Sequence, residues 1–226
     1  MAYCENWRIG RGESRMAEDI GPSAEESIRR FLEYCHRRRY SAKSIVIRAG
    51  DKPDTLYYIV EGSVTVLIED HQGREIILAY LNKGDFFGEM GLFAGQKNRS
   101  AWVRARTACE LAQISYGKFR QVVSEDPEIM FQLASQLALR LRKTSRKVSD
   151  LAFLDVTGRI ARTLLELANE PDAITHPDGL QIKVTRQELG RIVGCSREMV
   201  GRVLKTLEEQ GLIVVSGRSV VVFSRR

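Results

Sequence analysis

The hydrophobic pattern of this 226-residue chain changes character along its length. Residues 45–115 form short β-branched and aromatic runs that are broken by Gly and Asp. Short strands with frequent turns are typical of antiparallel sheets, whereas βαβ units would place helical segments between the strands. This stretch therefore predicts an antiparallel β-roll or barrel. Its turn signals recur at short intervals, at Gly50-Asp51, Glu61-Gly62, Gln72-Gly73 and Lys83-Gly84.

A helical period replaces the strand pattern over residues 116–152, after a shorter helical pattern at 28–34. A helix from Ile129 to Leu151 would be about 35 Å long, which is more than one small roll can cover. We therefore expect a second copy of the chain to pair along it, although packing on its own domain remains an alternative. Residues three or four apart form its stripe: Ile129, Leu133, Leu137, Leu141, Thr144, Val148 and Leu151.

The last third of the chain predicts a winged helix. A helix over 154–170, with Asp155 as a candidate N-cap, precedes a Pro-bearing loop from Pro171 to Gly179. A helix-turn-helix and a hairpin follow, the hairpin turning at Ser216-Gly217. The predicted fold class is α+β. We expect a flexible tail over 1–23, a β-roll over 24–125, a dimerisation helix over 126–153 and a winged-helix domain over 154–226.

The helix-turn-helix is the strongest local signal. Thr185 and Glu188 have the T-x-x-E spacing of a capping box, which predicts the start of a helix. Gly194 stands where a tight turn needs a left-handed backbone, a conformation that glycine adopts without strain. Ser196 is a good N-cap for the second helix. This second helix is therefore predicted to begin directly after a tight turn.

A helical wheel separates the second helix into an apolar face and a hydrogen-bonding face. Arginine can bond two acceptors of guanine, and glutamate can accept a hydrogen bond from cytosine. We therefore predict that Arg197, Glu198 and Arg202 read the bases of double-stranded DNA. An ordinary amphipathic helix with a solvated charged face is the alternative. The full predicted DNA-binding set also contains Thr185 and Arg186 as phosphate contacts, Ser196 and Lys205.

Composition excludes several other classes of protein. The net charge of +6 allows an anionic partner without naming one. The four cysteines are far apart, so we expect reduced thiols and no metal, haem or iron–sulfur cluster. We find no nucleophile–base pair or paired carboxylates, so no enzymatic activity is expected. The absence of a membrane-length apolar run or signal-peptide pattern predicts a cytoplasmic protein, and Met16 is a candidate alternative start.

A glycine-rich stretch is the candidate ligand segment. Gly84, Gly88 and Gly91 are followed by Arg99 and Ser100. Glycines let backbone N–H groups approach an anion, and arginine adds charge and a planar set of donors. The spacing matches neither G-x-G-x-x-G nor a P-loop, so a nucleotide-hydrolysing site is not indicated. Taken alone, the segment is also compatible with a β-roll turn that carries a surface arginine.

Several motifs resemble the cyclic-AMP receptor protein (catabolite activator) family over residues 31–223. They are GDFFGEMGLF, RSAWVRA, TSRKV, LAFLDVTGRIA, THPDG and TRQELGRIVGCSREMVGRVLK. The resemblance implies a homodimeric transcription regulator with cyclic AMP as its allosteric ligand. It implies that Gly88 and Glu89 bind the ribose region and that Arg99 and Ser100 hold the cyclic phosphate. It also places Thr144, Ser145 from a second copy and Arg140 near the ligand.

The resemblance further implies contacts with RNA polymerase. Thr175, His176 and Gly179 would face its α subunit, and His36, Arg38 and Lys118 would form a second contact. Met90 departs from the leucine of the family pattern, a tolerable change. Cyclic GMP or cyclic di-GMP as the ligand remains an alternative, as does DNA binding without a ligand. A cyclic-nucleotide regulatory subunit of an enzyme or channel is the alternative from another class.

Overall fold

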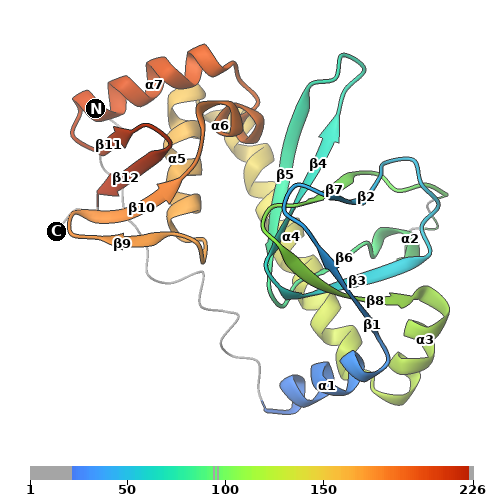
Figure 1. The fold of residues 1–226 in the computed structure, drawn as a ribbon. Helices are drawn as coiled ribbons and strands as arrows, with labels where there is room; N and C mark the ends of the chain where they lie inside the picture. Colours follow the sequence, from blue (N-terminus) through green and yellow to red (C-terminus); the bar gives the residue numbers. More distant parts are fainter. Residues whose placement is uncertain (1–21, 94, 96, 224–226) are drawn as a thin grey trace. The chain divides into compact units, whose positions relative to one another are not determined.

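The computed structural model describes residues 22–93, 95 and 97–223 (Figure 1). Within these residues the chain divides after Lys143 into two compact units. Most of the predicted tail lies outside the described residues. The prediction is wrong for its last two residues, because helix α1 spans Pro22–Glu33 and so begins six residues before the predicted pattern at 28. Proline suits the first turn of a helix because its φ is already helical and its missing N–H is not needed there.

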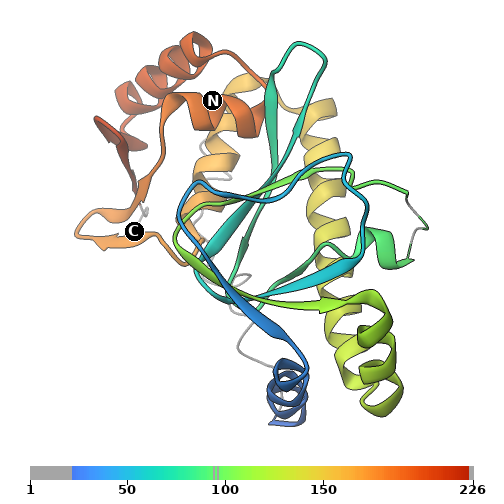
Figure 2. The same cartoon turned by 45° about the vertical axis from the view of Figure 1, so that its right-hand side comes forward.

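Two four-stranded antiparallel sheets form the body of the first unit, with strand orders β1-β8-β3-β6 and β2-β7-β4-β5 (Figures 1 and 2). In both views the β4–β5 hairpin extends beyond the neighbouring strands of its unit. The predicted turn glycines Gly50, Gly62, Gly73 and Gly84 all have positive φ, which confirms the turns. The elements are β1 (His36–Tyr40), β2 (Ile45–Ile47), β3 (Thr55–Glu61), β4 (Ser63–Glu69), β5 (Glu75–Asn82), β6 (Phe86–Phe87), α2 (Met90–Phe93), β7 (Trp102–Ala105) and β8 (Cys109–Ser115).

Strands β3, β6 and β8 of the β1–β8–β3–β6 sheet have buried residues on both faces, whereas most of β1 is exposed. One face packs against the other sheet through residues such as Ile59, Val64 and Leu111. The opposite face packs against the helices, where Phe31 of α1 meets Phe86 of β6 with ring centroids 5.4 Å apart. This double burial fixes β6, which leads into the candidate ligand segment.

The helical period of residues 116–152 is divided between two helices, α3 (Tyr116–Glu125) and α4 (Glu128–Phe153). The break falls at Pro127, whose ring cannot continue a helix without the loss of a hydrogen bond. The predicted stripe on α4 has two environments. Ile129 and Leu133 are fully buried in the core of their own unit, so for this part of the helix the alternative of packing on its own domain is confirmed. Leu141, Val148 and Leu151 are 61–69% exposed.

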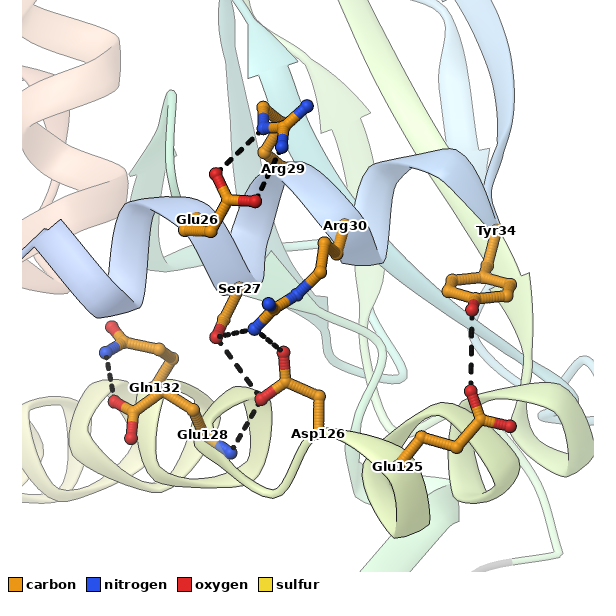
Figure 3. A network of polar contacts seen from close by, with 9 residues as sticks. All are labelled: Glu26, Ser27, Arg29, Arg30, Tyr34, Glu125, Asp126, Glu128 and Gln132. Atoms are coloured by element: carbon orange, nitrogen blue, oxygen red, sulfur yellow. Dashed lines mark hydrogen bonds and ion pairs between the residues drawn. The ribbon is translucent and has the colours of Figure 1, made fainter.

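A polar network fastens α1 to the junction of α3 and α4 (Figure 3). Arg30 donates to Asp126 at 2.7 Å, and the buried hydroxyl of Ser27 donates to the same carboxylate at 3.2 Å. Asp126 also accepts from the backbone N–H of Glu128 at 3.3 Å. Burial opposes ionisation of this carboxyl, but the hydrogen bonds from Arg30 and Ser27 outweigh burial and lower the pKa of Asp126. The start of α4 is therefore held in place by an ionised side chain.

The second unit contains the predicted winged helix. Asp155 is the N-cap of α5 and accepts from Gly158 N at 2.8 Å, as predicted. Its four-stranded sheet has the order β11-β12-β10-β9. None of the described helices is both long and apolar enough to cross a membrane. The elements are α5 (Val156–Ala168), β9 (Ile174–His176), β10 (Gly179–Lys183), α6 (Arg186–Val193), α7 (Arg197–Glu209), β11 (Ile213–Ser216) and β12 (Ser219–Phe223).

Two strand assignments correct the sequence-based expectation. The predicted loop from Pro171 to Gly179 contains β9 and the start of β10, because β10 pairs with β12 in the register Gly179↔Phe223. Strand β1 was also missed, because HRRRY shows no apolar alternation; all of its residues except Tyr40 are exposed. Strand β1 forms by long-range pairing with β8, and β9 pairs with the adjacent β10, which in turn pairs with the distant β12. The local pattern does not carry these distant pairings.

Candidate functional site

The backbone of Arg99 is fixed in the first unit by the turn at Gly50 and Asp51. Gly50 N donates to Arg99 O at 2.9 Å, and Arg99 N donates to Asp51 O at 2.8 Å. Its guanidinium donates to the carbonyl oxygens of Gly88 and Thr55, each at 2.7 Å. Two of the predicted ligand-site residues, Gly88 and Arg99, are therefore brought together, with Arg99 half-buried.

Tyr116 completes this arrangement and was missed by sequence reasoning. Its hydroxyl donates to Gly88 O at 2.5 Å and accepts from Arg99 at 3.0 Å. Burial is the largest influence on the pKa of Tyr116 and raises it, so the phenol remains a protonated donor. A single tyrosine at the start of a helix carries no local signal of this role, because its partners are 17 and 28 residues away.

Gly88 is required by both its conformation and its surroundings. Its φ is +80°, a backbone conformation that residues with a side chain rarely adopt. An added Cβ would lie 3.0 Å from the Arg99 guanidinium, 3.1 Å from Thr55 O and 3.2 Å from the Tyr57 ring. The absence of a side chain thus lets the arginine approach the Gly88 backbone.

Glu89 and Arg140 form the second part of the site. Glu89 is only 8% exposed, and its carboxylate lies 3.7 Å from the Arg140 guanidinium. Arg140 is on α4 and also donates to Phe86 O. Thr144 and Ser145 follow one turn later as exposed residues of α4, at the point where the chain passes into the second unit. Ser100, next to Arg99, is exposed.

The chemistry of this arrangement suits an anion. Guanidinium has five N–H donors, and three of those of Arg99 are engaged by Gly88, Thr55 and Tyr116 within the described part of the chain. The charge and two further donors are thus held in a fixed orientation before any ligand arrives. Planar, charged donors of this kind favour the oxygens of a phosphate.

The helix-turn-helix of the second unit has the predicted caps. Thr185 accepts from Glu188 N at 3.1 Å and starts α6. Gly194 ends α6 in the left-handed conformation, with φ 77° and ψ 47°. Ser196 accepts from Met199 N at 3.2 Å and starts α7. All three local predictions are confirmed.

Gly190 is a further residue of the turn that sequence reasoning missed. An added Cβ at Gly190 would lie 2.7 Å from Cys195 O. Both Gly194 N and Cys195 N donate to Gly190 O, at 2.8 and 3.0 Å. Because backbone approaches backbone here, the angle between α6 and α7 depends on glycine at this position.

The two faces of α7 are arranged as the wheel predicts. Val200, Val203, Leu204 and Leu207 are buried, and Met199 is partly buried. The opposite face is exposed and carries Arg197, Glu198, Arg202 and Lys205.

Two neighbours modify this exposed face. Arg186, at the start of α6, lies beside it, because its guanidinium is 3.8 Å from the place of a Cβ on Gly201. The pKa of Glu198 is lowered because its own backbone N–H and the Ser196 hydroxyl stabilise the carboxylate. Glu198 therefore also has a role at the N-terminus of α7, and base reading by these residues stays a prediction.

The residues predicted to contact RNA polymerase lie in both units. Thr175 and His176 are on β9, and Gly179 on β10 is paired directly with His176. His36 and Arg38 are exposed on β1. Lys118 lies over the ring of Tyr34, 5.1 Å from its centroid, and Tyr34 is two residues before His36. Within the described residues, no three His, Cys, Asp or Glu side chains gather in a way that could hold a metal ion.

Comparison with protein families finds two domains, one on either side of the structural division after Lys143. Residues 37–126 match the cyclic nucleotide-binding domain, and residues 158–226 match the Crp-like helix-turn-helix domain. Among solved structures, the regulator CLP of Xanthomonas campestris is 49% identical, with a TM-score of 0.83 over 89% of this chain and 100% of that chain. A CRP/FNR-family regulator from Thermus thermophilus has a TM-score of 0.72 at 29% identity, over 83% of this chain and 93% of its own.

Curated relatives extend over nearly the whole chain. The cAMP-activated global transcriptional regulator Vfr of Pseudomonas aeruginosa is 66% identical over 87% of this chain and 94% of its own length. The cAMP-activated global transcriptional regulator CRP of Escherichia coli is 60% identical over 91% of this chain and 98% of its own length. The chain therefore belongs to the CRP family of transcriptional regulators, with a cyclic nucleotide-binding domain and a helix-turn-helix domain.

Proposed function

We propose that this protein is a homodimeric transcription regulator that binds cyclic AMP and then grips a near-palindromic site on double-stranded DNA. The observation that carries the proposal is the guanidinium of Arg99, which is held in one orientation beside Gly88. The same chain also has a helix-turn-helix whose second helix is capped by Ser196. A pre-oriented cation suits the single negative charge of a cyclic phosphate.

Each residue of the ligand site has a proposed role. Arg99 and Ser100 hold the cyclic phosphate, because they offer a charged donor pair and an exposed hydroxyl. Gly88 and the buried Glu89 meet the ribose, whose neutral hydroxyl can donate to a carboxylate. Thr144 of the same subunit and Ser145 of the second subunit reach the base. Arg140 contributes from α4 through its ion pair with Glu89.

The exposed second half of α4 is the proposed dimer seam. Leu141, Val148 and Leu151 lie on one stripe of the helix and are all exposed in the single chain. Pairing of two such helices would remove this apolar surface from water. The two α7 helices of a dimer would then enter successive major grooves about 34 Å apart.

On the DNA, Arg197, Glu198 and Arg202 are the proposed base readers. Arg186 and Thr185 are the proposed phosphate contacts, which set orientation without carrying sequence information. Lys205 and Ser196 complete the proposed DNA-binding set. The resemblance of Thr175, His176 and Gly179 to a polymerase-contacting surface supports a contact with the RNA polymerase α subunit. That of His36, Arg38 and Lys118 supports a second polymerase contact. A regulator of this kind works in the cytoplasm, where bacterial DNA lies.

The test is operator binding with each cyclic nucleotide at one salt concentration, because affinity for DNA depends strongly on salt. Operators are selected from random duplex pools in parallel with and without cyclic AMP, and affinity is measured by fluorescence anisotropy. We expect cyclic AMP to tighten binding. Arg99→Ala should abolish this response, whereas Arg48→Ala, which removes an exposed arginine of the same unit, should retain it. Equal operator affinity with and without cyclic AMP would contradict the proposal.

Cyclic di-GMP is the second candidate ligand. The Xanthomonas campestris regulator, which is 49% identical, is described as c-di-GMP responsive. The higher identity to the two cAMP-activated regulators, 66% and 60%, favours cyclic AMP. A response to cyclic di-GMP alone in the same assay would favour the second candidate.

A further inference from the structure

Strand β6 is the edge strand of its sheet, yet its backbone is buried. It stands last in the order β1-β8-β3-β6, and the side chains of Phe86 and Phe87 are at most 2% exposed. On one side, the backbone just before β6 is hydrogen-bonded to Ile59 of β3: Ile59 N donates to Asp85 O, and Gly84 N donates to Ile59 O. A buried edge needs partners on the other side as well, because an unpaired backbone group away from water is costly.

Helix α4 supplies those partners through two side chains one turn apart. The Gln136 side-chain oxygen accepts from Phe86 N at 2.8 Å, and its NH₂ group donates to Gly84 O at 2.8 Å. Arg140 donates to Phe86 O and lies 3.3 Å from the Gln136 oxygen. The carboxamide thus replaces one residue of the missing neighbouring strand.

This connection places α4 relative to the ligand segment. The backbone that Gln136 holds, residues 84–86, leads within two residues into Gly88 and Glu89. Rotation or sliding of α4 at position 136 would break two hydrogen bonds at once, one to the buried Phe86 and one to the partly buried Gly84. These bonds therefore connect the backbone that precedes the ligand segment to α4, along which the exposed apolar stripe continues.

We infer that Gln136 is a positioning residue that couples occupancy of the cyclic-nucleotide site to the placement of α4, and thereby to DNA affinity. The inference rests on the proposed function and adds a specific mechanical link to it. Gln136 itself touches no ligand in this scheme and acts through Gly84 and Phe86. Glutamine suits the task because a single planar group offers both an acceptor and a donor.

The chain offers a matched control. Gln132 lies one turn earlier on α4, and its side chain bonds to Glu128 within the same helix (Figure 3). Gln136→Leu keeps the size of the side chain and removes both backbone bonds, while Gln132→Leu makes the same chemical change without touching β6. Gln136→Glu keeps the acceptor for Phe86 N and loses the donor to Gly84 O.

The experiment measures, for each full-length protein, the operator dissociation constant without and with saturating cyclic AMP. The ratio of the two is the coupling between the sites. We expect Gln136→Leu to lower this ratio by about tenfold, Gln136→Glu to lower it less, and Gln132→Leu to leave it unchanged. Hydrogen exchange of the Phe86 amide in the ligand-free protein should be faster in Gln136→Leu than in Gln132→Leu.

The outcomes are distinct. A lower melting temperature with an unchanged coupling ratio would show a merely structural role and overturn the inference. If Gln136→Leu does not fold, the ratio of Gln136→Glu decides in its place. A wild-type ratio of one would refute the proposed function, and this inference with it, before any variant is compared. A large wild-type ratio that both position-136 variants retain would refute this inference alone.

Discussion

Gly190 and Gly201 lie in the two helices of the helix-turn-helix and make a controlled pair for testing how close its backbones approach. The same change, glycine to alanine, adds one methyl group at each position. At Gly190 that methyl would lie 2.7 Å from the backbone oxygen of Cys195. At Gly201 its nearest neighbours would be atoms of the Arg186 side chain, at 3.8 and 3.9 Å.

The expected magnitudes follow from these distances. Alanine in place of glycine stabilises a helix interior by about 1 kcal/mol, a gain that both variants share. Gly201→Ala should realise this gain, since 3.8 Å is an ordinary van der Waals contact. Gly190→Ala should lose about 1–3 kcal/mol to overpacking, because neither backbone can move without changing the turn. The free energies of unfolding of the two variants should therefore differ by about 1–3 kcal/mol.

Native-state amide hydrogen exchange measures this difference within the unit itself. Leu189 N and Val200 N are suitable reporters, because they donate to Thr185 O and Ser196 O inside α6 and α7. Their protection should be about 5- to 150-fold lower in Gly190→Ala than in Gly201→Ala, the range of equilibrium constants that corresponds to about 1–3 kcal/mol. Equal protection in the two variants would refute the close approach of Gly190 to Cys195.

Three other predictions follow from single side chains. Arg197→Ala should weaken operator binding by about 1–3 kcal/mol and relax preference at one guanine, as measured by binding to single-base operator variants; equal weakening on all sequences would mean a phosphate contact. The side-chain hydrogen bond from Arg74 lowers the pKa of Asp70 to about 2. The contribution of the Asp70–Arg74 interaction to the stability of the fold should be present above pH 4 and be lost as the pH falls toward about 2. Arg74→Ala should return the NMR titration of this carboxyl toward its ordinary value. Burial raises the pKa of the Cys35 thiol to about 12, so iodoacetamide at pH 8 should modify it slowly in the folded protein and much faster in urea.

The local elements of the helix-turn-helix were predictable because their causes are local. A capping side chain bonds to a backbone N–H three residues away, as Thr185 and Ser196 do. The left-handed turn at Gly194 follows from the one residue type that adopts it without strain. The faces of α7 follow from the 3.6-residue period, which places Val200 and Leu204 on one side and Arg197 on the other.

The ligand site was only partly predictable, because its geometry depends on distant segments. The glycines and Arg99 could be singled out by type, but Tyr116, which fixes them, is 17 residues from Arg99 along the chain. Gln136 is 50 residues from Phe86 and reads in the sequence as an ordinary polar residue of a helix. Hydrogen bonds between segments leave no periodic trace in either of them.

The sequence by itself determined the two kinds of architecture, the caps and faces of α7 and the residue types of the candidate ligand segment. Periodicity, turn chemistry and side-chain type act within a few residues, so they can be recognised from short stretches of the sequence. The tertiary structure alone decided that HRRRY is a strand and that the loop after Pro171 contains a hairpin. It also decided that the first turns of α4 are buried in their own unit, while its later stripe is exposed. Each of these depends on which surface meets which partner, and that information exists only once the chain has folded.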